Sequence, residues 1–99
     1  MNVEGIPWLG VSFTIIRPEL AEFFSLKDVK IEGIIEGGPA EEAGLKRGDI
    51  IYSVNGKKVN MPQELQALIL YMQIGDKVEM KIIRDGKEIS YIVKIGKKP

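Results

Sequence analysis

Two hairpin turns constrain the fold of this chain more than any other feature of the sequence. Asn55-Gly56 and Asp85-Gly86 each separate two runs of β-prone residues. These dipeptides favour two-residue antiparallel turns, because both of their residues tolerate a positive φ. On either side of the second dipeptide, apolar residues alternate with polar ones, as expected of strands that bury one face. The sequence therefore predicts a mostly antiparallel sheet of short strands.

The first half of the chain predicts two further strands and a short helix. The opening strand covers 11–16, and Pro18 then starts a short helix that runs to Phe24. A second strand covers 29–35, where Gly33 indicates a bulge or a close backbone approach. Strand and helix therefore alternate from the beginning of the chain.

The second half adds two helices, of which the later one is the longest in the chain. Pro39 starts a helix of one or two turns, and Gly44 suits a left-handed cap at its end. Apolar residues recur at three- and four-residue spacings over 61–72, which predicts an amphipathic helix with Asn60 as its cap. The last residues, 96–99, are expected to fray or to begin a linker. The fold class is thus mostly β with α, an α+β barrel or sandwich of five to six short antiparallel strands, capped by one longer and one or two short helices.

Composition limits the chain to one domain and excludes several kinds of chemistry. Its 99 residues are expected to form a single domain with an ordered core of about 8–95. The 14 basic residues balance the 14 acidic ones, which argues against a nucleic-acid partner. The chain has no cysteine and no histidine, so it contains no Ser-His-Asp or Cys-His arrangement and no cysteine or histidine metal site. We expect no enzyme activity of its own, no cofactor, no metal and no direct membrane insertion.

The stretch Trp8-Leu9-Gly10-Val11 leads into the opening strand and is the candidate binding loop. A glycine between two aliphatic residues can present its amide in conformations that other residues avoid. Neighbouring amides that point the same way form a concavity suited to a carboxylate. The residues that share one parity of the strand are Leu9, Val11, Phe13 and Ile15. Our hypothesis is that this loop and strand hold the C-terminal end of another polypeptide; the alternative is an ordinary turn into a core strand.

Four pieces of the sequence, in this order, form a recognisable pattern. They are Trp8-Leu9-Gly10-Val11; Pro18-Glu19-Leu20-Ala21; Gly38-Pro39-Ala40 leading to Ala43-Gly44-Leu45, Gly48-Asp49-Ile50-Ile51 and Asn55-Gly56-Lys57; and Arg84-Asp85-Gly86-Lys87. Together they resemble a PDZ domain, and more narrowly the PDZ domains of HtrA/Deg-type serine proteases. The resemblance implies the circularly permuted bacterial topology, in which the carboxylate-binding loop opens the domain. It also implies a larger protease as the parent protein and an extracytoplasmic location, periplasmic or in the cell envelope, in a prokaryote.

Carried over residue by residue, the resemblance implies a peptide groove between the opening strand and the longer helix. The carboxylate-binding loop is Trp8, Leu9, Gly10 and Val11. The groove residues are Ser12, Phe13, Thr14, Ile15, Leu65, Gln66, Ile69 and Met72. On the helix, Leu68 and Met72 are expected to face inward and Ile69 to face the groove. The implied partners are C-terminal peptides of unfolded or substrate proteins that end in Val, Leu, Ile, Ala or Phe, added to the strand by β-augmentation.

The sequence departs from the family pattern before the binding loop, and it leaves other functions open. Some family members place an arginine just before the loop, whereas this chain has Ile6-Pro7, so carboxylate capture would rest on amides alone. The tripeptide Arg47-Gly48-Asp49 spells an integrin-recognition sequence, but it is interpreted as a turn into a strand. The main alternative is a docking or regulatory module that contacts a protease domain of the same parent chain, or another subunit, without binding free peptides. The parent could also be an intramembrane metalloprotease, a C-terminal processing protease or a secretion-system component.

Overall fold

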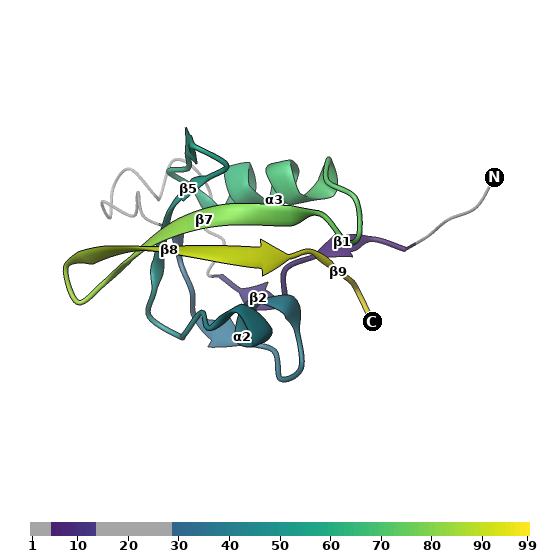
Figure 1. Ribbon diagram of the computed structural model, residues 1–99, viewed down its shortest axis with the longest axis horizontal. Coiled ribbons are helices and arrows are strands. Elements are labelled where there is room, and N and C mark those ends of the chain that lie inside the picture. The colour runs from purple at the N-terminus through teal and green to yellow at the C-terminus, as the bar shows by residue number, and fades with distance from the viewer. Residues whose placement is uncertain (1–4, 14–28) are drawn as a thin grey trace.

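The computed structural model describes residues 5–13 and 29–99 of the chain (Figure 1). In these residues the elements are β1 Pro7–Trp8, β2 Val11–Ser12, β3 Val29–Lys30, β4 Gly33–Ile34, α2 Pro39–Ala43, β5 Ile50–Val54, β6 Lys57–Lys58, α3 Pro62–Leu70, β7 Lys77–Arg84, β8 Lys87–Lys94 and β9 Gly96–Lys97. The expected helix from Pro18 to Phe24 and the end of the opening strand lie outside the described residues.

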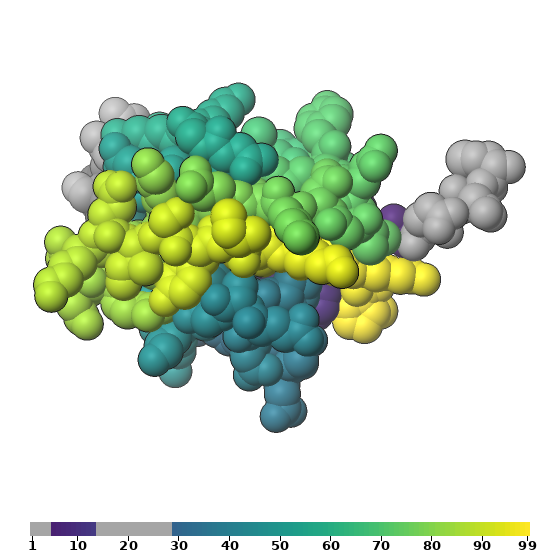
Figure 2. Space-filling view, viewed as in Figure 1, coloured from purple at the N-terminus to yellow at the C-terminus, as the bar shows by residue number. Residues whose placement is uncertain are grey.

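All strand pairings in this part of the chain are antiparallel, which confirms the predicted fold class. The strands form one five-stranded sheet of order β3-β5-β7-β8, with β6 beside β5, and two two-stranded sheets, β1-β9 and β2-β4. The sheets are therefore separate and open, and the described strands do not close into one barrel. Figure 1 shows the long β7-β8 ribbon crossing the molecule between α3 and α2, and Figure 2 shows the same ribbon dividing one face of the surface.

The two predicted hairpin turns are confirmed. Asn55 and Asp85 are the non-glycine residues with positive φ in the described chain, at 51° and 54°, and Gly56 and Gly86 follow at 82° and 75°. Two successive positive φ angles define the turn that matches the twist of paired strands. The alternation is confirmed too, because the β7 residues that face the core, Val78, Met80 and Ile82, are all buried.

The second predicted strand is divided between two sheets. Val29 of β3 pairs with Ile51 of β5, whereas Gly33 of β4 pairs with Ser12 of β2. The chain changes sheets between Ile31, whose N–H donates to the Asp49 carbonyl, and Glu32, whose N–H donates to the Ser12 carbonyl. A Cβ on Gly33 would come within 2.7 Å of the Ser12 hydroxyl oxygen. At Gly33 the chain therefore changes sheets, and the absence of a side chain there lets Ser12 approach closely.

The expectation that residues 96–99 fray is wrong for Gly96 and Lys97, which form β9. Pro7 pairs with Lys97 and Trp8 with Gly96, and the Lys98 N–H donates to the Ile6 carbonyl at 2.9 Å. Gly96 permits this, because a Cβ there would lie 2.7 Å from the Pro39 side chain. The lead-in to the opening strand and the end of the chain therefore lie side by side (Figure 1).

The helices begin and end close to their predicted bounds. Gly44 caps α2 with φ of 102°, as expected, and Pro39 occupies its first turn. The longer helix, α3, is shorter than the predicted 61–72 at both ends. Met61 rather than Asn60 is its N-cap, because the Glu64 carboxylate accepts hydrogen bonds from the N–H groups of both residues, at 2.7 and 3.0 Å. Asn60 is therefore held outside the helix.

A buried ion pair joins the turn before β5 to the end of β7. The Arg84 guanidinium donates to both carboxylate oxygens of Asp49, at 2.9 and 2.8 Å, to the Tyr91 hydroxyl at 2.9 Å and to the Gly44 carbonyl at 3.1 Å. Asp49 is only 2% exposed, and it also accepts the Lys46 N–H. The aspartate of the Arg-Gly-Asp tripeptide is thus a structural residue and is not displayed at the surface.

Stability at low pH should depend on this pair. Burial would raise the pKa of the Asp49 carboxyl, but the hydrogen bonds from Arg84 and Lys46 outweigh it and lower the pKa below its ordinary 3.8. The pair therefore stabilises the fold fully above about pH 4, and the stabilisation is lost as pH falls through the lower, folded pKa. We expect Asp49→Asn to be less stable at neutral pH and to lose less stability on acidification, measured by thermal denaturation. Equal losses in the two proteins would contradict this.

Candidate functional site

The loop from Leu9 to Val11 is anchored by its carbonyl groups. The Leu9 carbonyl accepts the Ala40 N–H, and the Gly10 carbonyl accepts the Ile35 N–H, both at 2.9 Å. Gly10 has φ of 83°, and a Cβ there would lie 3.1 Å from the Pro39 ring. Glycine is therefore required both for the backbone conformation and for packing against α2.

The amides of the same loop are left for another partner. In the described chain, the N–H groups of Leu9 and Gly10 donate to no backbone carbonyl. Val11 faces Ile34 at a position of the β2-β4 ladder where the two residues exchange no hydrogen bonds, since the Ile35 N–H donates to Gly10. The N–H and C=O of Val11 therefore point to the other edge of β2, which has no neighbouring strand among the described residues.

A cleft of about 220 Å³ lies between this loop and strand and the helix α3. Its lining residues are Ile6, Pro7, Trp8, Leu9, Gly10, Val11, Phe13, Leu65, Gln66, Ile69, Leu70 and Lys98. Leu9, Leu65 and Ile69 belong to the buried core, and Val11 and Phe13 pack against that core while remaining partly exposed. The cleft thus has an apolar floor continuous with the core.

Eight of the twelve predicted site residues line this cleft. They are Trp8, Leu9, Gly10, Val11, Phe13, Leu65, Gln66 and Ile69. Ser12 is exposed and alternates away from the cleft, as strand geometry requires. Met72 follows the end of α3 and lines a separate hollow with Pro7 and Ile74. Thr14 and Ile15 lie outside the described residues.

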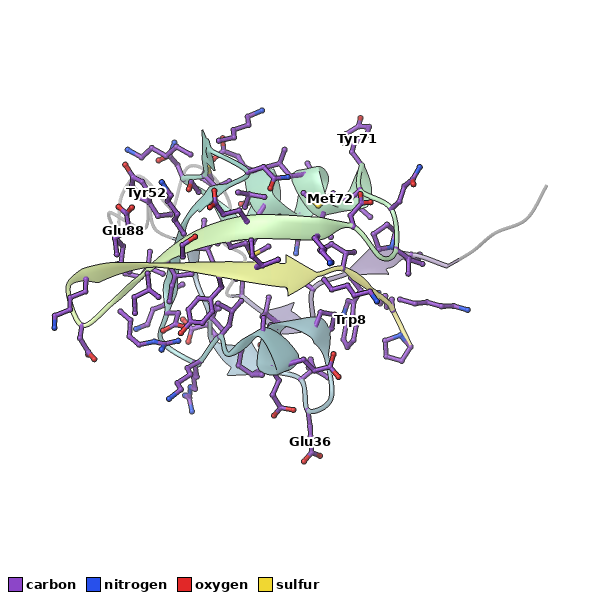
Figure 3. The ribbon with its side chains drawn as sticks, in the orientation of Figure 1. Trp8, Glu36, Tyr52, Tyr71, Met72 and Glu88 are labelled. Atoms are coloured by element: carbon purple, nitrogen blue, oxygen red, sulfur yellow. The ribbon has the colours of Figure 1, made fainter. Side chains whose placement is uncertain are left out.

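The expectation that Leu68 and Met72 face inward while Ile69 faces the groove needs correction. Leu65 and Ile69 are 1% and 6% exposed, whereas Leu68 and Met72 are only partly buried. Ile69 therefore belongs to both the core and the cleft, and Leu68 is the less inward residue. Tyr71 extends away from the body at the end of the helix (Figure 3). Since α3 ends at Leu70, Met72 lies beyond the helical spacing of Leu65 and Ile69.

Trp8 comes directly before Leu9 and is partly exposed. Figure 3 shows it beside β9 and α2, and a Cβ on Gly38 would lie 3.4 Å from its ring. The ring therefore supports the approach of α2 to the loop, while the residue as a whole also lines the cleft.

Sequence reasoning missed four lining residues, Ile6, Pro7, Leu70 and Lys98. Ile6 and Lys98 are brought together by the β1-β9 pairing, which joins opposite ends of the chain and has no local pattern. Among the described residues that line the cleft, Lys98 is the one charged residue. The described residues hold no group of three or more acidic side chains placed to bind a metal, and they include no helix long and apolar enough to span a bilayer.

A family model described as PDZ domain matches residues 7–95. The chain belongs to the PDZ domain family. This PDZ domain is 37% identical over 95 residues to a probable periplasmic serine endoprotease, DegP-like, from Hahella chejuensis. It is 39% identical over 95 residues to the protein of that name from Marinomonas sp.. Each match covers 93% of this chain but only 20% of the relative.

Solved structures of HtrA-type proteins are also similar to this PDZ domain. The HtrA-type protease AlgW, solved with a decapeptide, matches with a TM-score of 0.79 and 26% identity, over 95% of this chain and 30% of that one. The HtrA3 PDZ domain bound to a phage-derived ligand, FGRWV, matches with a TM-score of 0.71 and 20% identity, over 90% and 84% of the two chains, which supports the fold. The resemblance to HtrA/Deg-type PDZ domains is therefore confirmed, and the relatives' names agree with an extracytoplasmic location.

Proposed function

We propose that this PDZ domain binds the C-terminal end of an extended polypeptide in the cleft between β2 and α3. The observation that carries the proposal is the edge of β2 that no described strand pairs with; it runs along an apolar cleft and begins at a loop whose Leu9 and Gly10 amides donate to no described carbonyl. The last residue of an incoming strand would donate its N–H to the C=O of Val11, and such main-chain pairing supplies affinity independent of sequence. The terminal carboxylate would accept hydrogen bonds from the amides of Leu9, Gly10 and Val11.

The last side chain of the ligand would enter the apolar cleft. There it would meet Leu9, Val11 and Ile69, with Leu65 beneath them and Phe13 and Gln66 shaping the next inward-facing positions. Aliphatic walls favour Val, Leu, Ile, Ala or Phe, whose burial contributes about 1.5–3 kcal/mol. Because the interface is small, we expect a Kd in roughly the micromolar range.

The relatives support a proposal about the parent protein, although this chain spans only about a fifth of their length. We propose that it is a DegP-like serine endoprotease of the periplasm in which this domain recruits substrates or regulates cleavage. The AlgW structure with a decapeptide supports a peptide ligand. With no histidine or cysteine, the chain has no catalytic triad of its own, so catalysis would belong to another part of the parent.

Amidation of the ligand tests the proposal. We expect a fluorescent decapeptide ending in valine with a free carboxylate to bind the isolated domain, measured by fluorescence polarisation. The same peptide with an amidated terminus should bind about tenfold or more weakly, because hydrogen bonds to a charged acceptor contribute about 1.5–3 kcal/mol.

A peptide of scrambled sequence that keeps the terminal valine separates the terminus from the rest of the chain. It should retain most of the affinity, since main-chain pairing does not depend on sequence. Equal affinity for acid and amide would reject carboxylate capture. No binding to a broad set of free C-termini would instead favour the docking module.

A further inference from the structure

Lys98 brings the one charge found among the described residues of the cleft lining. It comes from the far end of the chain, and its position is fixed by the β1-β9 pairing and by its N–H, which donates to the Ile6 carbonyl at 2.9 Å. The neighbouring lining residues, Ile6, Pro7 and Trp8, directly precede the amide loop, which is the segment from Leu9 to Val11. A basic residue therefore lines the cleft beside the segment that leads into that loop.

The side chains of Lys97 and Lys98 lie against different parts of the molecule. The aliphatic carbons of Lys97 lie over Gly5, where a Cβ would approach them to 2.7 Å. Lys98, the residue after β9, instead lines the cleft. The ion pairs of the described residues are Lys81 with Glu88 and Arg84 with Asp49, so the Lys98 ammonium is not engaged by a described carboxylate.

We propose that Lys98 is a specificity-determining residue of the cleft, which selects ligands that end in a free carboxylate at the amide loop. The inference rests on the proposed peptide-binding function and adds to it a charge that the amides do not supply. The flexible four-carbon stem lets the ammonium follow the carboxylate as a point charge. Because Lys98 is solvent-exposed, its effect is modest and is screened by salt.

The test compares Lys98 with its neighbour Lys97, which carries the same charge but does not line the cleft. Lys98→Ala, Lys98→Glu and Lys97→Ala are each titrated with a neutral synthetic decapeptide ending in valine, as the free acid and as the amide, at about 0.05 and 0.5 M salt. We expect Lys98→Ala to weaken the acid about threefold at low salt, and Lys98→Glu about tenfold. Neither change should affect the amide, and both effects should shrink at high salt.

Three outcomes are distinguishable. Loss of acid affinity in the Lys98 variants but not in Lys97→Ala supports the proposal. Equal affinities of Lys98→Ala, Lys97→Ala and the unaltered domain for the acid, with discrimination against the amide retained, overturn the role of Lys98 and leave carboxylate capture by the amides standing. If the unaltered domain binds neither peptide, the proposed function and this inference are both overturned.

Discussion

Val11→Asp is expected to abolish peptide binding while the domain remains folded. Val11 lies on β2, whose outer edge pairs with no described strand; it lines the cleft and is only partly buried. An aspartate there removes apolar contact with the ligand's last side chain and places a negative charge beside its carboxylate. We expect at least about a 30-fold loss of affinity, roughly 2 kcal/mol, measured by fluorescence polarisation.

Ile92→Asp is the matched control. Ile92 is 59% exposed, lies on β8 and is absent from the cleft lining, so the same change of size and charge should leave affinity unaltered. Ile69→Asp is less informative, because Ile69 is only 6% exposed and a charge in the core would destabilise the fold. A folded Val11→Asp variant that binds as well as Ile92→Asp would place the pocket elsewhere.

Arg84→Ala is expected to cause a large loss of stability. It leaves the Asp49 carboxylate buried without the guanidinium that donates to both of its oxygens. Removing one partner of a buried pair costs about 3–5 kcal/mol; since Arg84 is partly exposed, we expect a smaller loss, about 2–3 kcal/mol. Urea denaturation followed by circular dichroism measures it.

Lys81→Ala provides the comparison on the same strand. Lys81 forms an exposed ion pair with Glu88 at 3.9 Å, so its loss should cost under about 0.5 kcal/mol. If Arg84→Ala were no more destabilising than Lys81→Ala, the buried pair would not be holding the turn before β5 against the end of β7.

The fold was predictable where its determinants are local. Asn55-Gly56 and Asp85-Gly86 specify their turns within two residues, and the alternation on β7 and β8 specifies which face is buried. The β1-β9 pairing was not predictable, because it joins Pro7 to Lys97 without a hydrophobic pattern in either segment. The division of 29–35 between two sheets likewise depends on contacts with Asp49 and Ser12, which are distant in sequence.

The candidate site shows the same division. Gly10 and the aliphatic residues beside it were recognisable, because a positive φ and an open backbone require glycine. Lys98 was not, since it reaches the cleft only through the pairing of the two ends of the chain. Met72 was misplaced because α3 ends at Leu70, before the apolar spacing does.

The most direct test of the central claim is an NMR titration of the isotope-labelled domain with the valine-ended peptide as acid and as amide. We expect the amide protons of Leu9, Gly10 and Val11 to shift downfield and to exchange more slowly with solvent when the free acid binds. The amidated peptide should produce little of this change. Shifts confined to other surfaces, or identical shifts at these amides with both peptides, would contradict carboxylate capture by the loop that opens β2.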